Sequence, residues 1–201
     1  MRRTPHLIPL LHPALPESIS MLASLREPES PGEPKRIRER VDGDFLLRAL
    51  LQRMGGDPSW SLQRIDGCKP VARRKGDTAW LSLSHTHGML AGAASLDVDL
   101  GIDLEPRKRP LSPALGGRIL HPDESRWWRA DESEDLLRLW TLKEAALKRC
   151  GTGLRTRMNR VRVEPVRPGE FQITLASHPP MRSICWNEHD HWISVAWTEV
   201  E

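Results

Sequence analysis

The stretch DESEDLLRLWTLKEAALKRCGTGL, residues 131–154, constrains the fold more than any other part of this chain. It contains no proline, and its apolar residues recur at helical spacing, so it predicts an amphipathic helix with one stripe packed inward. Asp131, with Glu134 three residues later, is a candidate N-terminal cap, while Gly151 and Gly153 supply a stop. We therefore expect a single long helix over this whole stretch.

Three residues of this helix form an unusual line. Trp140, Glu144 and Lys148 are spaced four apart, which places a carboxylate and an amine in one row beside a large aromatic ring. Taken alone, the Glu144 and Lys148 pair is an ordinary surface ion pair, worth roughly a few tenths of a kcal/mol. A second acidic motif, further upstream, favours a functional interpretation.

That motif is GIDLE, an alternation typical of a strand that places Asp103 and Glu105 on one face. Together with Glu144, these carboxylates would form a hard-oxygen site of the kind that binds magnesium. Asp97 and Asp99 have the same parity, so periodicity alone does not select the pair that meets a metal. At about 3.3 Å per residue the whole acidic run is too long for all four side chains to bind one ion.

The order of GIDLE and then WTLKEAALK resembles the paired signature of the 4'-phosphopantetheinyl transferases, specifically the larger type that activates polyketide, peptide and fatty acid synthases. The family moves the phosphopantetheine arm of coenzyme A to a serine of a carrier protein and releases adenosine 3',5'-bisphosphate. The resemblance implies that Asp103, Glu105 and Glu144 hold magnesium and that Lys148 lies by the phosphates or the attacking serine. Asp97 and Asp99 are then interpreted as turn or surface residues.

The first half of the chain supplies candidate contacts to the coenzyme. The resemblance implies that Lys69 meets its phosphates, and that Ser84 and His85 bind the 3'-phosphate and pyrophosphate. The chain departs from the family here, because Cys68 directly precedes Lys69 and an additional residue, His87, follows Thr86. A hydrolytic Ser84 and His85 dyad is disfavoured, because adjacent strand residues point to opposite faces and no GxSxG motif surrounds them.

A basic row, KRIRER, precedes an amphipathic run that ends on glycine, and together they predict a helix over residues 36–54. The row is either a solvated helix start or a clamp for the phosphates of coenzyme A. The resemblance implies that one arginine in this region contacts the nucleotide. The candidates are Arg36, Arg38 and Arg40.

Short strands are predicted for most of the remaining chain, because runs of strand-forming residues are separated by glycine. Residues 14–36 are rich in proline and are expected to be largely irregular. The other runs are 60–65, 78–84, 89–96, VRVEPV, FQITLA, MRSICW and HWISVAWTEV.

The two halves share one order, a helix that ends in glycine followed by several strands. The long form of the family fuses two such units, and a length of 201 residues fits it. We therefore expect an α+β fold with two similar halves in tandem, each a helix packed on a small, mainly antiparallel sheet. Residues 1–98 would contribute to coenzyme A binding, and residues 99–201 would carry the magnesium and catalytic residues, with the coenzyme between them.

The basic composition is compatible with several classes of anionic partner and does not distinguish between them. A net charge of +3 and a pI near 9.0 suit nucleic acid, an anionic cofactor or an acidic protein. Three widely spaced cysteines without a CxxC pair predict reduced thiols in a cytoplasmic protein, and no apolar run reaches the length of a membrane span. The cations that directly follow GIDLE would face phosphates, an acidic carrier protein or solvent. They are Arg107, Lys108 and Arg109.

The resemblance thus predicts a monomeric, magnesium-dependent transferase with coenzyme A as co-substrate and an acidic acyl or peptidyl carrier protein as partner, without nucleic acid or membrane. Glu144, or a water that it holds, is the candidate acceptor of the serine proton. Two alternatives remain open. One is a magnesium-dependent pyrophosphate hydrolase acting on coenzyme A or nucleotides, and the other is a non-catalytic basic binding protein.

Overall fold

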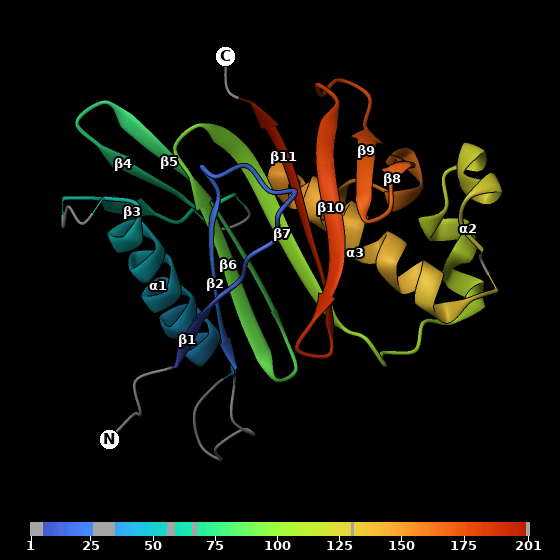
Figure 1. Cartoon of the computed structure of the whole chain (residues 1–201), viewed down its shortest axis with the longest axis horizontal. Helices are drawn as coiled ribbons and strands as arrows, with labels where there is room; N and C mark the ends of the chain where they lie inside the picture. The colour runs from blue at the N-terminus through green and yellow to red at the C-terminus, as the bar shows by residue number, and fades with distance from the viewer. Residues whose placement is uncertain (1–5, 26–34, 56–58, 66–67, 130, 200–201) are drawn as a thin grey trace.

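The computed structural model of the chain contains two antiparallel sheets, each covered by a helix (Figure 1). It describes residues 6–25, 35–55, 59–65, 68–129 and 131–199, and within them the side chains of residues 35–38 are not described. No helix in these ranges has both the length and the apolar character that crossing a membrane requires.

The first sheet has six strands in the order β1-β2-β6-β5-β4-β3. Helix α1 (Lys35–Arg53) covers one face, where Leu46, Leu47 and Leu50 pack against the sheet. This helix confirms the amphipathic run predicted over residues 36–54. The strands are β1 (Leu7–Pro9), β2 (Ser20–Leu25), β3 (Ser61–Gln63), β4 (Val71–Arg74), β5 (Asp77–Thr86) and β6 (Met89–Ser95).

The second sheet has five strands in the order β7-β11-β10-β9-β8. Helix α3 (Ser133–Arg149) packs on one face, together with a short helix α2 (Gly116–Ile119) whose Ile119 belongs to the same core. The strands are β7 (Val98–Pro106), β8 (Arg162–Arg167), β9 (Glu170–Thr174), β10 (Met181–Glu188) and β11 (His191–Glu199). The 3-10 turns are η1 (Pro113–Leu115), η2 (Pro122–Arg126), η3 (Gly153–Arg155) and η4 (Met158–Arg160).

The two sheets pack against each other through a shared apolar cluster, so the layers run helix, sheet, sheet, helix. Leu100, Ile102 and Leu104 of β7 belong to this cluster, together with Met89 and Ala91 of β6. The alternate residues of β7 therefore face α3, as the GIDLE pattern predicted. This arrangement confirms the α+β fold of two similar halves in tandem.

Hydroxyl groups join the two sheets where β7 lies beside β5. The backbone N–H groups of Ile102 and Leu104 donate to the hydroxyls of Ser82 and Ser84, at 3.0 and 3.3 Å. Strand β7 is at an edge of its sheet, and these serines satisfy backbone donors that its neighbour β11 does not reach. The acidic strand is thus held on one side by β11 and on the other by side chains of the first half.

Helix α3 is shorter than the stretch that predicted it. It begins at Ser133 with Glu132 as N-cap, and no side chain caps it. The Asp131 carboxylate instead accepts a hydrogen bond from Arg129, so the predicted Asp131 cap is wrong. The end is as predicted, because Gly151 adopts a φ of +70° and the chain closes in a Schellman motif.

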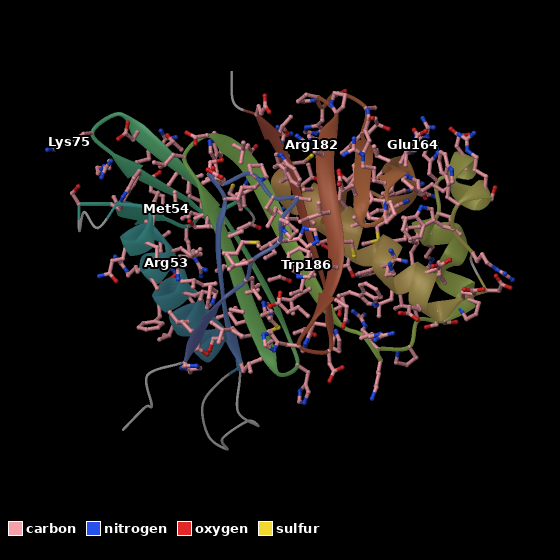
Figure 2. The ribbon with its side chains drawn as sticks, viewed as in Figure 1. Arg53, Met54, Lys75, Glu164, Arg182 and Trp186 are labelled. Atoms are coloured by element: carbon pink, nitrogen blue, oxygen red, sulfur yellow. The ribbon has the colours of Figure 1, made fainter. Side chains whose placement is uncertain are left out.

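The proline-rich segment 14–36 is only partly irregular. Strand β2 lies within it and pairs with β1 and β6, so an irregular segment there was the wrong expectation, while residues 26–34 lie outside the described residues. Strand β4 was also missed, because its sequence VARR has little apolar alternation. It is paired with β5 through a tight turn in which Lys75 and Gly76 adopt φ values of 41° and 95°, and Lys75 projects outward at the tip (Figure 2).

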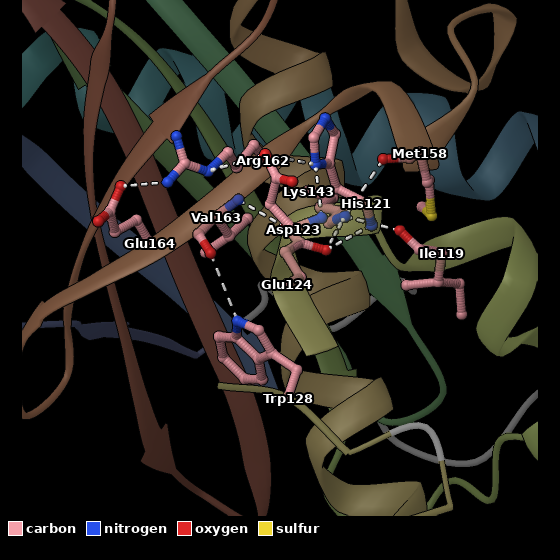
Figure 3. A network of polar contacts seen from close by, with 10 residues as sticks. All are labelled: Ile119, His121, Asp123, Glu124, Trp128, Lys143, Met158, Arg162, Val163 and Glu164. Atoms are coloured by element: carbon pink, nitrogen blue, oxygen red, sulfur yellow. Dashed lines mark hydrogen bonds and ion pairs between the residues drawn. The ribbon is translucent and has the colours of Figure 1, made fainter. Parts of the chain in front are cut away.

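A buried ion pair ties α3 to the segment that precedes it (Figure 3). The Lys143 ammonium donates to a carboxylate oxygen of Glu124 at 2.7 Å and to the carbonyl oxygens of Ile119 and Met158, at 2.6 and 3.3 Å. The other Glu124 oxygen accepts from the N–H of Val163 at 2.6 Å. Both charged side chains are fully buried, and every ammonium proton has an acceptor, which is what makes burial of this charge tolerable.

Glycine at position 101 lets α3 lie directly against β7. A Cβ atom there would be 2.1 Å from the carbonyl oxygen of Ala145 and 2.4 Å from the backbone nitrogen of Arg149. Helix and strand backbones therefore touch at this point, with Asp99 and Asp103 two residues to either side. The glycine of GIDLE therefore sets the distance between the acidic strand and the helix that carries Glu144.

We expect Gly101→Ala to lower the free energy of unfolding by about 1–3 kcal/mol or more, because both atoms it would meet belong to the helix backbone. Urea unfolding measures this change. Gly117→Ala is the matched control, since nothing lies within 4 Å of a Cβ at that position and helix formation favours alanine. Equal stability of the two variants would contradict the close contact at residue 101.

Candidate functional site

Asp103 on β7 is the centre of a buried polar cluster. One of its carboxylate oxygens, Oδ1, accepts a hydrogen bond from the Lys148 ammonium at 2.7 Å and another from the Ser84 hydroxyl at 2.8 Å. The other oxygen, Oδ2, is buried and has no hydrogen-bond partner among the described residues. Asp103 is only 5% exposed, so an unpartnered oxygen there is costly unless a further group binds it.

Two more carboxylates lie near Asp103. Burial, and then the neighbouring Asp103 charge, raise the pKa of Glu144 to about 7. Burial also raises the pKa of Glu105, partly offset by its hydrogen bond from Arg109. The Arg109 guanidinium lies 5.6 Å from the Trp140 ring centroid, so the row on α3 and the acidic strand do meet. Glu144 therefore binds a proton readily, first because it is buried and second because the three carboxylates outnumber the two cations beside them.

The carboxylate oxygens of Asp103, Glu105 and Glu144 are ligands that suit a hard divalent cation. Three neighbouring carboxylates, of which Asp103 raises the pKa of the other two and has one oxygen without a partner among the described residues, are the kind of ligands that magnesium prefers. Within the described part of the chain, however, no three His, Cys, Asp or Glu side chains are already grouped as a metal site. Instead, Arg109 forms an ion pair with one oxygen of Glu105, and Lys148 forms an ion pair with one oxygen of Asp103. The three-ligand magnesium site thus stays a prediction.

Ser84 is committed to the cluster. Its hydroxyl proton is donated to Asp103, and its oxygen accepts from the N–H of Leu104. The side chain is buried and does not line the neighbouring cavity, whereas His85 does. A phosphate contact from Ser84, as the sequence predicted, would have to replace the bond to Asp103 because a hydroxyl has one proton to donate.

A cavity of about 530 Å³ lies beside the cluster, between the two halves. Its walls come from the first sheet, from α1, and from the end of α3 with the loop that follows. The Lys148 side chain belongs to both the cavity and the cluster, because its ammonium is bonded to Asp103. Cationic side chains predominate. They are Arg40, Arg64, Lys69, Lys148 and Arg155, with one carboxylate, Glu39.

Most predicted coenzyme contacts line this cavity. Lys69, His85, Lys148 and Arg40 all do so, and His85 lies 3.3 Å from a Glu39 oxygen. The backbones of Arg36 and Arg38 lie in the first turn of α1, but their side chains fall outside the described residues, so neither is placed in the cavity. The structure thus gathers predicted residues from both halves around one space.

Several wall residues were not predicted from the sequence as coenzyme contacts. Arg64 follows β3 and pairs with Asp44 of α1 at 3.1 Å, while Arg155 lies on η3 and donates to the carbonyl of Gly151 at 2.8 Å. Thr152 also lines the cavity and has a buried hydroxyl without a partner among the described residues. Neither arginine belongs to a motif, and only the pairing of distant segments could have revealed them.

Asp97 and Asp99, taken as turn or surface residues, have different positions. Asp97 is exposed in the turn between β6 and β7, as predicted. Asp99 lies within β7, is largely buried and forms ion pairs with Lys69 and Arg149, so the prediction for this residue is wrong. The error arose because period-two spacing cannot say which acidic residues of a strand have cations opposite them.

Comparison with known proteins agrees with this geometry. A family model described as the 4'-phosphopantetheinyl transferase superfamily matches residues 99–196. The chain is also similar to the 4'-phosphopantetheinyl transferase psf-1 of Bacillus pumilus, with 26% identity over 155 residues that cover 70% of this chain. The similarity covers 62% of that relative, so the chain spans less than two thirds of its length. The matched residues include β7 and α3, the elements that bring Asp103 and Glu144 together, and over this range the chain is similar to the 4'-phosphopantetheinyl transferase superfamily.

Proposed function

We propose that this protein transfers the 4'-phosphopantetheine group of coenzyme A to a serine of an apo acyl or peptidyl carrier protein. The observation that carries the proposal is the cavity lined by cations from both halves, which borders the Asp103 cluster through Lys148. A ligand with a pyrophosphate and a 3'-phosphate matches such a wall, because each phosphate gains charge-assisted hydrogen bonds there. The carboxylate cluster beside it is suited to reaction at the pyrophosphate.

The reaction exchanges one phosphorus–oxygen bond for another. The serine oxygen bonds to the phosphorus that carries the pantetheine, and the bond from that phosphorus to the bridging oxygen breaks. Adenosine 3',5'-bisphosphate leaves with the bridging oxygen, and the serine hydroxyl loses its proton. The protein must therefore bind the leaving phosphates, orient the serine and accept one proton.

Asp103, Glu105 and Glu144 would hold magnesium, which when bound neutralises the pyrophosphate oxygens. The Lys148 ammonium lies on the cavity wall and adds positive charge for the departing phosphate. Glu144 is the candidate proton acceptor, directly or through a water, because a carboxyl whose pKa lies near 7 accepts protons at neutral pH. Metal binding would make Glu144 a weaker base, so these two roles of the carboxylate compete.

The protein partner is proposed to be an acidic carrier protein in the cytoplasm, modified by a monomeric enzyme. Of the three cations after β7, Arg107 is 3.4 Å from Glu134 and Arg109 is bonded to Glu105, while Lys108 is exposed. Complementary charge would raise the rate of encounter, and salt would reduce that effect.

The test is to incubate the protein with coenzyme A, magnesium chloride and a panel of apo carrier proteins, and to measure the carrier masses. We expect one carrier to gain a phosphopantetheine group, with release of adenosine 3',5'-bisphosphate. Consumption of coenzyme A without any modified carrier would instead support the pyrophosphate hydrolase. Binding of nucleic acid or acidic protein that ignores magnesium and coenzyme A would support the non-catalytic alternative.

Magnesium binding should itself depend on pH. Because the pKa of Glu144 is raised to about 7, its carboxyl is mostly protonated below that pH and must release the proton to bind a metal. We expect magnesium chloride to raise the melting temperature more at pH 8 than at pH 6, relative to potassium chloride of equal ionic strength. The Glu144→Gln variant should lose this pH dependence. A melting temperature that magnesium leaves unchanged at both values would exclude the proposed metal site.

A further inference from the structure

Asp99 connects two cations that come from different halves of the molecule. One carboxylate oxygen contacts the ammonium of Lys69, which lies just before β4, and the other lies 3.4 Å from Nε of Arg149, at the end of α3. The three side chains are 10, 18 and 11% exposed for Lys69, Asp99 and Arg149. Nothing in the reaction above uses Asp99 or Arg149.

Lys69 is enclosed on its other sides by both halves. Its ammonium lies 5.5 Å from the ring centroid of Trp80 on β5. Its Cβ lies 3.9 Å from the position that a Cβ of Gly151 would occupy, so the stem packs beside the turn that ends α3. Lys69 also lines the cavity. These contacts hold its otherwise flexible side chain in one position on the cavity wall.

The counter-charge on Asp99 is needed because Lys69 and Arg149 are both cations with little access to water. Burial lowers the pKa of Lys69, and Arg149 lowers it further, while Asp99 opposes both effects. Without Asp99, the Lys69 ammonium and the Arg149 guanidinium would repel each other in a poorly solvated space. Lys69 has the more flexible side chain, so its ammonium is the group that would move away. One carboxylate for two cations still leaves a net positive charge at the cavity wall.

We propose that Asp99 is a positioning residue for coenzyme binding, which holds the Lys69 ammonium on the cavity wall where it meets a phosphate group of coenzyme A. The proposal rests on the proposed function for the identity of the ligand. It assigns Asp99 no contact with the ligand or with the reacting atoms.

A double-mutant cycle tests the proposal, with coenzyme A affinity measured by titration calorimetry on the full chain. A charge-assisted phosphate contact is worth about 1.5–3 kcal/mol, so Lys69→Met should weaken binding roughly tenfold to a hundredfold. Asp99→Asn should weaken it roughly tenfold in the wild-type background and leave it unchanged in the Lys69→Met background. In the transfer reaction Asp99→Asn should raise KM for coenzyme A and leave kcat within about twofold, a split that general loss of structure would not produce.

Two controls separate positioning from other effects. Asp97→Asn makes the same change in charge two residues away, on an exposed turn, and should leave affinity unchanged. Arg149→Gln should preserve affinity within about twofold, because Asp99 then pairs with Lys69 alone. If Asp99→Asn does not fold, the Arg149→Gln result still decides, since a loss as large as that of Lys69→Met would overturn the proposal.

The proposal is also overturned if Asp99→Asn weakens coenzyme A binding equally in the wild-type and Lys69→Met backgrounds. It is overturned as well if Asp99→Asn leaves binding unchanged in both. Its failure is distinguishable from failure of the proposed function, because carrier modification by the wild-type protein is measured separately. Transfer without coupling between Asp99 and Lys69 rejects the positioning role alone. Coupling in coenzyme A binding without transfer rejects the transferase alone, and wild-type protein that does not bind coenzyme A rejects both.

Discussion

Replacing Asp103 with asparagine is expected to abolish carrier modification and to leave the protein folded. The substitution removes the charge from the one carboxylate that contacts Lys148 and has an unpartnered buried oxygen. Loss of one preorganised electrostatic group in a catalytic site typically costs roughly a hundredfold or more in rate. The measurement is the rate of carrier modification at saturating coenzyme A and magnesium.

The fold should tolerate this change for a local reason. The asparagine carbonyl oxygen can still accept from the Ser84 hydroxyl, so the contact between β5 and β7 remains. Lys148 is 27% exposed, and water can therefore solvate its ammonium once the carboxylate is gone. Asp97→Asn is the control, because that residue is exposed in the turn before β7. Full activity of the Asp103→Asn protein, together with an unchanged magnesium response, would remove Asp103 from the proposed centre.

The largest effect on stability is expected for the buried pair of Lys143 and Glu124 (Figure 3). Breaking a buried ion pair by removing one partner typically costs about 3–5 kcal/mol, because the other charge is left without compensation. Lys143→Met should therefore lower the free energy of unfolding by about that amount. Glu124→Gln should do the same, since its amide would place N–H groups against the donors of His121 and Lys143. Urea unfolding of the full chain measures both.

Two further variants show whether the cost comes from the uncompensated charge. The double variant Lys143→Met with Glu124→Leu should be less destabilised than the sum of Lys143→Met and Glu124→Leu measured singly, because it leaves no buried charge. Glu132→Gln breaks the pair of Glu132 and Arg129, which are 52 and 65% exposed, and should cost at most about 1 kcal/mol. If Lys143→Met lowers the free energy of unfolding by less than about 1 kcal/mol, the buried pair does not hold α3 to the preceding segment.

Periodicity determined the main elements of this fold. The row on α3, the alternation in GIDLE and the glycine that ends α3 each depend on neighbours in the sequence, and the structure confirms them. The order and spacing of two motifs were also enough to indicate the family whose model matches residues 99–196. The helix start at 133 and the strands β1, β2 and β4 were not predicted, because caps and strand pairing depend on partners that local patterns do not specify.

The candidate site divides in the same way. The sequence by itself named Asp103, Glu105, Glu144 and Lys148, because these residues occur in two recognisable motifs. Only the tertiary structure decided which charges face each other, since neither period-two spacing nor the motif indicated that Asp99 lies opposite Lys69 and Arg149. The cations at the cavity wall without a motif depend likewise on the packing of the two halves. Contacts between residues far apart in the chain are set by that packing, which no local pattern encodes.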